Sequence, residues 1–204
     1  MSTRERLMDA TERIIREQGI MAVTTKDIAR AAGFSEATLY RHFQDKTDLL
    51  LAVMSERISG SFLRLIRELP ERARTGTLQA TLEELAAAAL AFFAHTAPLS
   101  AAIAADPAFA ARHYARLREL GAGPEVALRS VMAYLEAEQD LGQVRADASP
   151  AAAATLLLGV CFNYAATRHA AGHAASILPE ERFAPEIVRT LLHGLAPAPG
   201  PTGA

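Results

Sequence analysis

The residues best suited to binding chemistry lie in one short stretch, TTKDIARAAGFSEATLYRHFQDK, at positions 24–46. Thr38 can donate or accept a hydrogen bond at a base edge, and Arg41 can bind a guanine bidentately or contact a phosphate. Lys46 offers a charged amine suited to a phosphate. Side chains of these types, so closely spaced, predict contact with DNA.

Two short helices and a tight turn are expected to position these side chains. Thr24 can cap the first helix, and Asp27 stands three residues later, where its carboxylate can reach back to the cap amide. Gly33 follows the last helical residue, where a left-handed backbone is usually needed. Ser35 then caps the second helix. This is the helix-turn-helix pattern, whose second helix enters the DNA major groove.

The helical repeat of about 100° per residue decides which side chains of the second helix face DNA. Leu39 and Phe43 lie at i and i+4 and point inward, whereas Tyr40 and His42 project from opposite flanks toward the phosphates. The outward positions are Ala37, Thr38 and Arg41. The alternative is a surface helix with ordinary polar residues. Because the caps, the turn and the outward face agree, they favour DNA.

The segment LYRHFQDK, placed after TTKDIA and AGFS, resembles the amino-terminal signature of TetR-family transcriptional regulators. The resemblance covers about residues 3–54, and from residue 55 onward the chain matches the family in layout rather than in motif. Glu36 and Ala37 occupy places where the family varies. The resemblance implies ten DNA-facing positions: Thr24, Thr25, Lys26, Glu36, Ala37, Thr38, Tyr40, Arg41, His42 and Lys46.

Composition fits a small DNA-reading head joined to a larger domain. Half of the 204 residues are hydrophobic and 22% are charged, so a substantial core is expected. The net charge of −2 argues against a protein that coats nucleic acid nonspecifically. Residues 1–50 carry eight basic and eight acidic side chains. Affinity must therefore come from placed contacts and dimer avidity, and it should still fall with salt.

Cysteine usage and hydropathy predict a soluble, cytoplasmic protein. The single Cys161 excludes an intramolecular disulfide and lies in an apolar helix, which favours a packed thiol over a redox sensor. The charged start, MSTRERLMDATER, is not a signal peptide. The most apolar run, at 151–166, is 16 residues long, short of the ~20 that span a bilayer.

Periodicity and breaker residues predict an all-α fold. Ser2 and Glu5 form a capping box that opens a first helix, and Gly19 ends it. One long helix at 45–69 is expected to tie the head to the larger domain. Further helices are predicted at 78–95, 99–105, 108–120, 124–141, 150–171 and 180–195. The expected domains are a helix-turn-helix domain at 1–54, a helical ligand-binding and dimerisation domain at 55–195, and a disordered tail at 196–204.

The predicted helix at 150–171 is apolar nearly all round, so it should be covered on both sides. The last helix carries a second apolar stripe. The alternative is that both helices only complete the monomer core. A dimer interface is preferred, and the TetR resemblance implies one here, built as a four-helix bundle. The interface residues would be Leu156, Gly159, Val160, Phe183, Ile187 and Leu191.

Aromatic and polar side chains in the middle of the chain suit an apolar pocket with sparse polar anchors. Aromatics at helical spacing are also common in cores, and the family resemblance favours the pocket. Its candidate residues are Phe92, Phe93, His95, Phe109, His113, Tyr114, Leu117, Met132, Leu135, Phe162, Tyr164 and Arg168.

Catalytic and metal-binding patterns are weak. The run Gly121, Ala122, Gly123 has neither the third glycine nor the preceding strand of a dinucleotide loop. His169 and His173 stand at i and i+4, but no acidic or cysteine partner accompanies them, so a metal site is not favoured. No catalytic triad, P-loop or paired carboxylates stand out. The chain is therefore not expected to be an enzyme or to hold a cofactor.

These features together predict a dimeric TetR-type repressor that binds a palindromic operator and is released by a small lipophilic or aromatic effector. Its partners would be operator DNA, that effector and a second copy of the chain, with no membrane. One alternative is a DNA-binding regulator that no small ligand controls. The other is a helical small-molecule binding protein or enzyme without a DNA role, which operator binding sensitive to Tyr40 would exclude.

Overall fold

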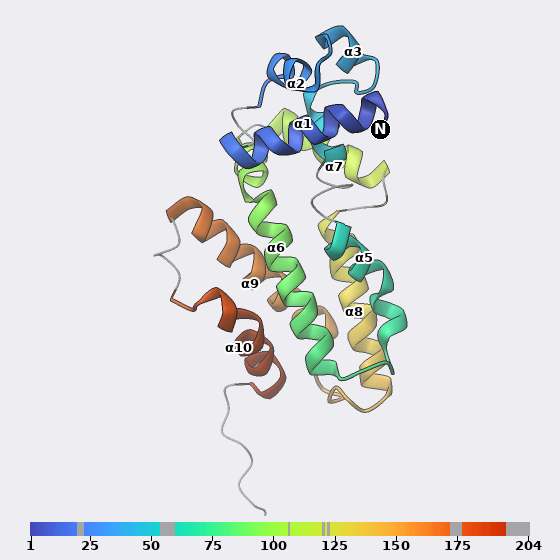
Figure 1. Ribbon diagram of the computed structural model, residues 1–204. Helices are drawn as coiled ribbons and strands as arrows, with labels where there is room; N and C mark the ends of the chain where they lie inside the picture. The colour runs from blue at the N-terminus through green and yellow to red at the C-terminus, as the bar shows by residue number, and fades with distance from the viewer. Residues whose placement is uncertain are drawn as a thin grey trace, which may run out of the picture.

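The computed structural model describes residues 1–19, 23–53, 60–105, 107–119, 121, 123–171 and 177–194. Throughout these ranges the regular structure is helical, which confirms the predicted all-α class (Figure 1). The elements are α1 Thr3–Gln18, α2 Thr25–Ala32, α3 Glu36–Tyr40, α4 Lys46–Val53, α5 Gly60–Glu68, η3 Leu69–Arg72 (a 3-10 helix), α6 Leu78–Ala105, α7 Pro107–Glu119, α8 Pro124–Asp140, α9 Pro150–Ala171 and α10 Glu180–His193.

The amino-terminal helices α1 to α4 share one hydrophobic core at one end of the molecule (Figure 1). The capping box predicted at Ser2 and Glu5 opens α1, and α1 packs against both α2 and α4. The buried faces of all four helices meet there, with Leu7, Ile28, Leu39 and Leu49 fully buried. This core gives the two short helices α2 and α3 the support that they lack alone.

A second, larger core is built around α6. This helix packs mainly against α9 and also against α10, and α8 contacts both α9 and η3. Leu82, Leu85, Tyr134, Leu157 and Phe183 are among its fully buried side chains. The predicted domain boundaries fall at residues 54–55 and 195–196, which lie outside the described residues, as does the predicted tail.

Two predicted helix boundaries differ from the structure. Leu78–Ala105 is one continuous helix through position 98, where the sequence predicted a break. An interior proline costs a helix about 3 kcal/mol, and burial of Leu82, Leu85, Ala89 and Ala97 along α6 offsets that cost. The single helix predicted at 45–69 is seen as α4 and α5, and the linking residues 54–59 lie outside the described part.

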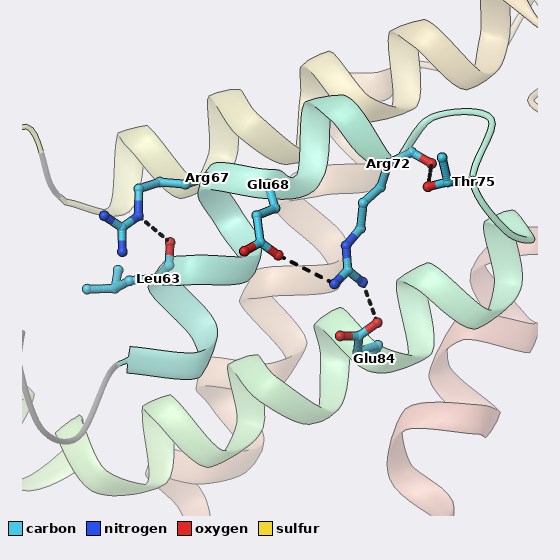
Figure 2. Close-up of polar contacts among 6 residues, drawn as sticks. All are labelled: Leu63, Arg67, Glu68, Arg72, Thr75 and Glu84. Carbon is cyan, nitrogen blue, oxygen red and sulfur yellow. Dashed lines mark hydrogen bonds and ion pairs between the residues drawn. The ribbon is translucent and has the colours of Figure 1, made fainter.

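Arg72 joins three segments at the end of the molecule far from α1 (Figures 1 and 2). Its guanidinium contacts Glu84 on α6 at 2.5 Å and Glu68 on α5 at 3.6 Å. Thr75 donates to the Arg72 carbonyl at 2.9 Å and closes the turn into α6. These contacts orient η3, whose Leu69 is buried in the larger core.

A buried polar group lies close to Arg72. Tyr134 is 1% exposed and forms side-chain hydrogen bonds with Thr81 and Glu138, both of which are also buried. Burial raises the pKa of Tyr134 to about 12, so its phenol stays neutral. The mutual hydrogen bonds satisfy groups that would be costly to bury alone.

The single cysteine is packed inside the larger core. Cys161 has no exposed surface, and its thiol lies 3.7 Å from the Ala86 carbonyl oxygen. Burial raises its pKa to about 12. Because the thiolate is the reactive form, this environment suits the predicted packed thiol.

Gly33 is expected to be a sensitive position in the head. It takes φ +75°, and an added Cβ would lie 3.2 Å from the Arg6 guanidinium. Gly33→Ala should destabilise the head by about 1–2 kcal/mol, because non-glycine residues are strained in this conformation. Gly33→Asn should cost less, since asparagine tolerates it better. Thermal unfolding checks this order, and an alanine variant as stable as wild type would contradict it.

Candidate nucleic-acid interface

Local hydrogen bonds define the helix-turn-helix as the sequence predicts. The Thr24 hydroxyl accepts from the Asp27 amide at 3.1 Å, and the Ser35 hydroxyl accepts from the Thr38 amide at 3.2 Å. Gly33 ends α2 in the left-handed conformation. One detail differs, because the Asp27 carboxylate accepts from the Thr24 hydroxyl at 2.5 Å instead of meeting the cap amide.

Two arginines of α1 contact residues in and after the turn between α2 and α3. Arg6 donates to the Ala32 carbonyl at 2.9 Å, and its guanidinium lies 4.6 Å from the centre of the Phe34 ring. Arg4 lies 5.3 Å above the Phe43 ring. The carbonyl bond satisfies an acceptor that the end of α2 leaves open. These cations therefore support the turn between α2 and α3.

None of the ten predicted DNA-facing residues is buried. Tyr40 is 51% exposed. Three of the ten, Thr25, Thr38 and Lys46, are partly covered. The exposed ones are Thr24, Lys26, Glu36, Ala37, Tyr40, Arg41 and His42. Leu39 and Phe43 are buried, as predicted. Helix α3 ends at Tyr40, earlier than the sequence pattern predicts, so Arg41, His42 and Phe43 follow the helix. The buried and exposed sides are nevertheless the predicted ones.

Hydrogen bonds restrain the polar side chains of this surface before any DNA is present. The Thr38 hydroxyl lies 3.0 Å from the Ser35 hydroxyl and accepts from Arg41 at 3.1 Å. The Thr25 hydroxyl donates to the Glu36 carboxylate at 2.6 Å and so joins α2 to α3. Arg41 must leave Thr38 to bind a base or a phosphate with its full fork of donors.

Other acidic side chains of the head have local roles at helix starts. The Asp45 carboxylate accepts from the Asp48 amide at 2.8 Å, and Asp48 accepts from the Gln44 amide at 3.1 Å. Asp27 pairs with Arg30 at 3.0 Å. Asp45 thus caps α4 as predicted, and Lys46 begins that helix. A lysine here suits contact with a phosphate on the DNA backbone.

Comparison with known proteins identifies this arrangement. Residues 7–53 match the profile of the family described as bacterial regulatory proteins, tetR family. The helix-turn-helix domain at these residues belongs to the TetR family. The match covers α1 from residue 7 onward and all of α2, α3 and α4, including all ten predicted DNA-facing residues.

One curated relative is the uncharacterized HTH-type transcriptional regulator YvkB of Bacillus subtilis (strain 168). It is 41% identical over 63 residues, which are 30% of this chain and 33% of the relative. The matched stretch therefore spans about a third of the relative's own length.

Solved structures share the whole fold. A transcriptional regulator FadR from Bacillus subtilis, in complex with stearoyl-CoA, superposes with a TM-score of 0.68 at 15% identity, over 94% of this chain and 99% of that one. A complex of SmeT with triclosan gives a TM-score of 0.63 at 23% identity, over 98% and 100% of the two chains. The fold shared with these two structures thus extends through α10.

Seven of the twelve predicted pocket residues fall into three separate groups. Phe92 and Phe93 of α6 belong to the first, an aromatic cluster with Phe62 of α5 and Phe162 of α9. The Phe62 and Phe92 rings stack at 4.8 Å, and Phe93 meets Phe162 edge-on at 5.5 Å. Phe162 is 41% exposed, so the cluster reaches the protomer surface.

The second group lies on α7 and the third between α9 and α10. His113 is buried 5.4 Å from the ring of Tyr114, and burial lowers the His113 pKa. The Tyr164 hydroxyl donates to the carbonyl of Leu178, just before α10, at 2.7 Å. Arg168 pairs with Glu180 at 2.8 Å.

The remaining predicted pocket residues are more scattered. Leu135 is buried in the larger core and Met132 packs against it. Leu117 is partly buried, whereas His95 is exposed. The Phe109 side chain lies outside the described part. Two hollows of about 270 and 460 Å³ involve none of the predicted pocket residues, so the pocket stays a prediction.

The residues predicted for a dimer interface differ in how exposed they are on the protomer. Leu156 is 64% exposed, and a Cβ added at Gly159 would meet nothing within 4 Å. The partly buried members, which pack on the protomer core, are Val160, Ile187 and Leu191. Phe183 is 1% exposed and lies 4.3 Å from the Tyr164 ring. Its assignment to the interface was wrong, because it has no surface left for a partner.

Helix α9 is also the one described helix that is long and apolar enough to cross a membrane. Its most apolar window has a mean hydropathy of 1.3, and 28% of that window is buried within the protomer. Much of the surface of α9 is therefore not buried by the rest of the protomer. Near its end His169 is exposed, and His173 lies outside the described residues.

Sequence reasoning missed two features of these sites. Phe62 joins the aromatic cluster from α5, although it is not among the predicted pocket residues. The bond between Thr25 and Glu36 joins residues eleven apart. No helical period marks such a pair, because its geometry depends on how the turn places α3 against α2.

Proposed function

We propose that this chain is a dimeric, DNA-binding transcriptional regulator that acts as a ligand-released repressor in the cytoplasm. The observation that carries the proposal is the capped helix-turn-helix at 24–46 within a TetR-family match. Gly33 turns α2 into α3, and the exposed side of α3 and its carboxyl-terminal cap offers Thr38, Tyr40 and Arg41. Nothing in this arrangement requires catalysis, and its side chains are types that contact bases and phosphates.

The proposed dimer forms through α9 and α10, and a second copy covers the apolar surface of α9. Exposed Leu156 and the open position at Gly159 support close approach by a partner helix. A two-fold dimer places its recognition helices in major grooves about 34–36 Å apart, or a multiple of that spacing. The operator would then be palindromic.

The proposed effector is lipophilic and binds in the helical domain near the aromatic cluster of Phe62, Phe92, Phe93 and Phe162. Support comes from the similar folds that hold stearoyl-CoA in FadR and triclosan in SmeT. Both ligands have large apolar parts, which suit apolar pockets with few polar anchors.

A second candidate is a regulator that no small ligand controls. The separation of the predicted pocket residues into three groups favours it, because Tyr164 and Arg168 already bind Leu178 and Glu180. Both candidates share the DNA-reading head. They differ in whether a lipophilic molecule changes operator affinity.

Variants of the head test the shared proposal. Lys46→Ala and Tyr40→Phe should weaken binding to all sequences, since each removes a phosphate contact, and Lys46→Ala should lower the salt dependence by about one unit. Arg41→Ala should also change base preference, at about 1–3 kcal/mol if the contact is to a base. Band shifts on selected and randomised duplexes measure both effects.

Arg145→Ala is a matched control, because it removes an exposed cation between α8 and α9, far from the head. It should leave DNA affinity unchanged. If Tyr40→Phe, Lys46→Ala and Arg41→Ala all bind like wild type, the proposed DNA-binding surface is wrong. If wild type enriches no sequence, the regulator proposal itself is wrong.

A further inference from the structure

We propose that Glu36 reads the operator and selects cytosine at one position of each half-site, with Thr25 as the residue that positions it. The inference rests on the proposed DNA-binding function and deepens it, because it names a base that the head prefers. The starting observation is that Glu36, an acidic residue, lies on a surface whose other side chains suit contact with negatively charged DNA.

The position of Glu36 is restrained by the structure. The Thr25 hydroxyl donates to Oε1 of Glu36 at 2.6 Å, across the turn between the first residues of α2 and α3. A carboxylate has about four acceptor sites on its two oxygens, and this bond occupies one of them. Glu36 is exposed, so it keeps acceptor sites available on the outer surface of the head.

The chemistry of Glu36 excludes a phosphate as its partner. An ionised carboxylate only accepts hydrogen bonds, and a DNA phosphate offers only acceptors and the same sign of charge. In a helix-turn-helix the amino-terminal residues of the second helix contact base edges in the major groove. The donors in that groove are the amino groups of cytosine and adenine.

Cytosine is the better match of the two bases. It presents its N4 amino group as a donor, and glutamate is the side chain that accepts from it. Adenine places an acceptor, N7, beside its amino group, and therefore suits asparagine or glutamine, which offer one donor and one acceptor. A second carboxylate oxygen near N7 would be repelled.

Glu36 differs from Asp27, Asp45 and Asp48 in the partners that its carboxylate contacts. Asp45 and Asp48 accept from backbone amides at the start of α4, and Asp27 accepts from Thr24 and pairs with Arg30. The contact of Glu36 is with one side chain. A competing explanation is that the hydrogen bond between Thr25 and Glu36 only joins α3 to α2. The variants must therefore distinguish a role in reading a base from a role in stabilising the head.

Glu36→Gln separates them because glutamine can still accept from Thr25 while offering an amide in place of the second oxygen. Full-length wild type and variant would each select from a randomised duplex pool, followed by affinity measurements on single-base changes. Wild type should prefer cytosine about tenfold at one position in each half-site, equivalent to ~1.4 kcal/mol. Glu36→Gln should shift that position to adenine, and Glu36→Ala should lose the preference.

Thr25 is tested by restoring or removing its hydroxyl. Thr25→Val should reduce the cytosine preference severalfold at that position, with base preferences elsewhere unchanged. Thr25→Ser keeps the hydroxyl and should restore the preference. A merely structural bond would change affinity for all sequences equally, or stability, without moving one position of the preferred site.

The outcomes distinguish this inference from the function on which it rests. Wild type, Glu36→Gln and Glu36→Ala could all select the same base at every position. That result would overturn the proposed role of Glu36 and leave the DNA-binding proposal standing. Failure of wild type to enrich any sequence would overturn the DNA-binding proposal as well. Arg145→Ala, which removes an exposed cation outside the head, serves as the control and should leave the cytosine position unchanged.

Discussion

Leu156→Glu is expected to convert the dimer to monomers and to lower operator affinity by about 10²–10⁴-fold, the range over which two linked binding modules exceed one. Leu156 is 64% exposed in the protomer, so the change leaves the protomer's own core intact. At a two-fold interface the new carboxylate would be buried in both copies. Burying an unpaired charge is costly enough to prevent association.

Leu141→Glu is the matched control, since Leu141 is an exposed leucine that follows α8, outside α9 and α10. It should remain dimeric and bind operator like wild type. Light scattering at micromolar concentration gives the assembly state, and band shifts give the affinity. A well-folded wild-type monomer, or a dimeric Leu156→Glu variant with full affinity, would contradict the proposed interface.

The head could be predicted in detail because its structure depends on short-range interactions. Thr24, Gly33 and Ser35 act on atoms within a few residues of themselves, and their side-chain chemistry specifies caps and a left-handed turn. Leu39 and Phe43 follow from the helical period alone. Each of these features is seen at the predicted residue.

The larger domain was predictable only in its class and in most of its helices. Position 98 was expected to break a helix, but long-range packing along α6 outweighs the local preference of proline. Phe183 lies on an apolar stripe that could equally meet a partner or its own core, and only the packing of α10 on Tyr164 decides it. Helical spacing identifies apolar faces without identifying what covers them.

The pocket residues show the same limit of local reasoning. Phe92, Phe93 and Phe162 come together with Phe62, whereas Tyr164 and Arg168 point toward α10. Which aromatic side chains meet depends on the crossing of α5, α6 and α9, and that crossing is a tertiary property.

The second large effect is expected between the effector and the operator. A lipophilic ligand that binds near the aromatic cluster should weaken operator binding by about 5–150-fold, equivalent to a coupling of ~1–3 kcal/mol. The link must be mechanical, because the cluster lies on α5, α6 and α9, while the predicted DNA contacts lie on α2 to α4. A ligand can shift this balance only if it binds the two states with different affinities.

Helix α6 offers the mechanical path. Its 28 residues extend about 42 Å at 1.5 Å per residue, and its carboxyl-terminal end lies toward the head (Figure 1). A small displacement of α6 by a ligand would therefore be carried to the head. In a dimer such a displacement changes the separation of the two recognition helices, on which operator binding depends.

Reciprocity makes this coupling measurable from either side. If ligand lowers operator affinity by some factor, operator must lower ligand affinity by the same factor. Stearoyl-CoA and triclosan serve as separate probes, each titrated into the full chain with and without operator. Phe162→Ala should weaken ligand binding, since it removes the partly exposed ring of the cluster, while leaving operator affinity without ligand unchanged. Equal ligand affinity in the two titrations would mean that a site for the probe exists but does not control DNA binding, and the regulator without a small-molecule switch would then be the correct reading.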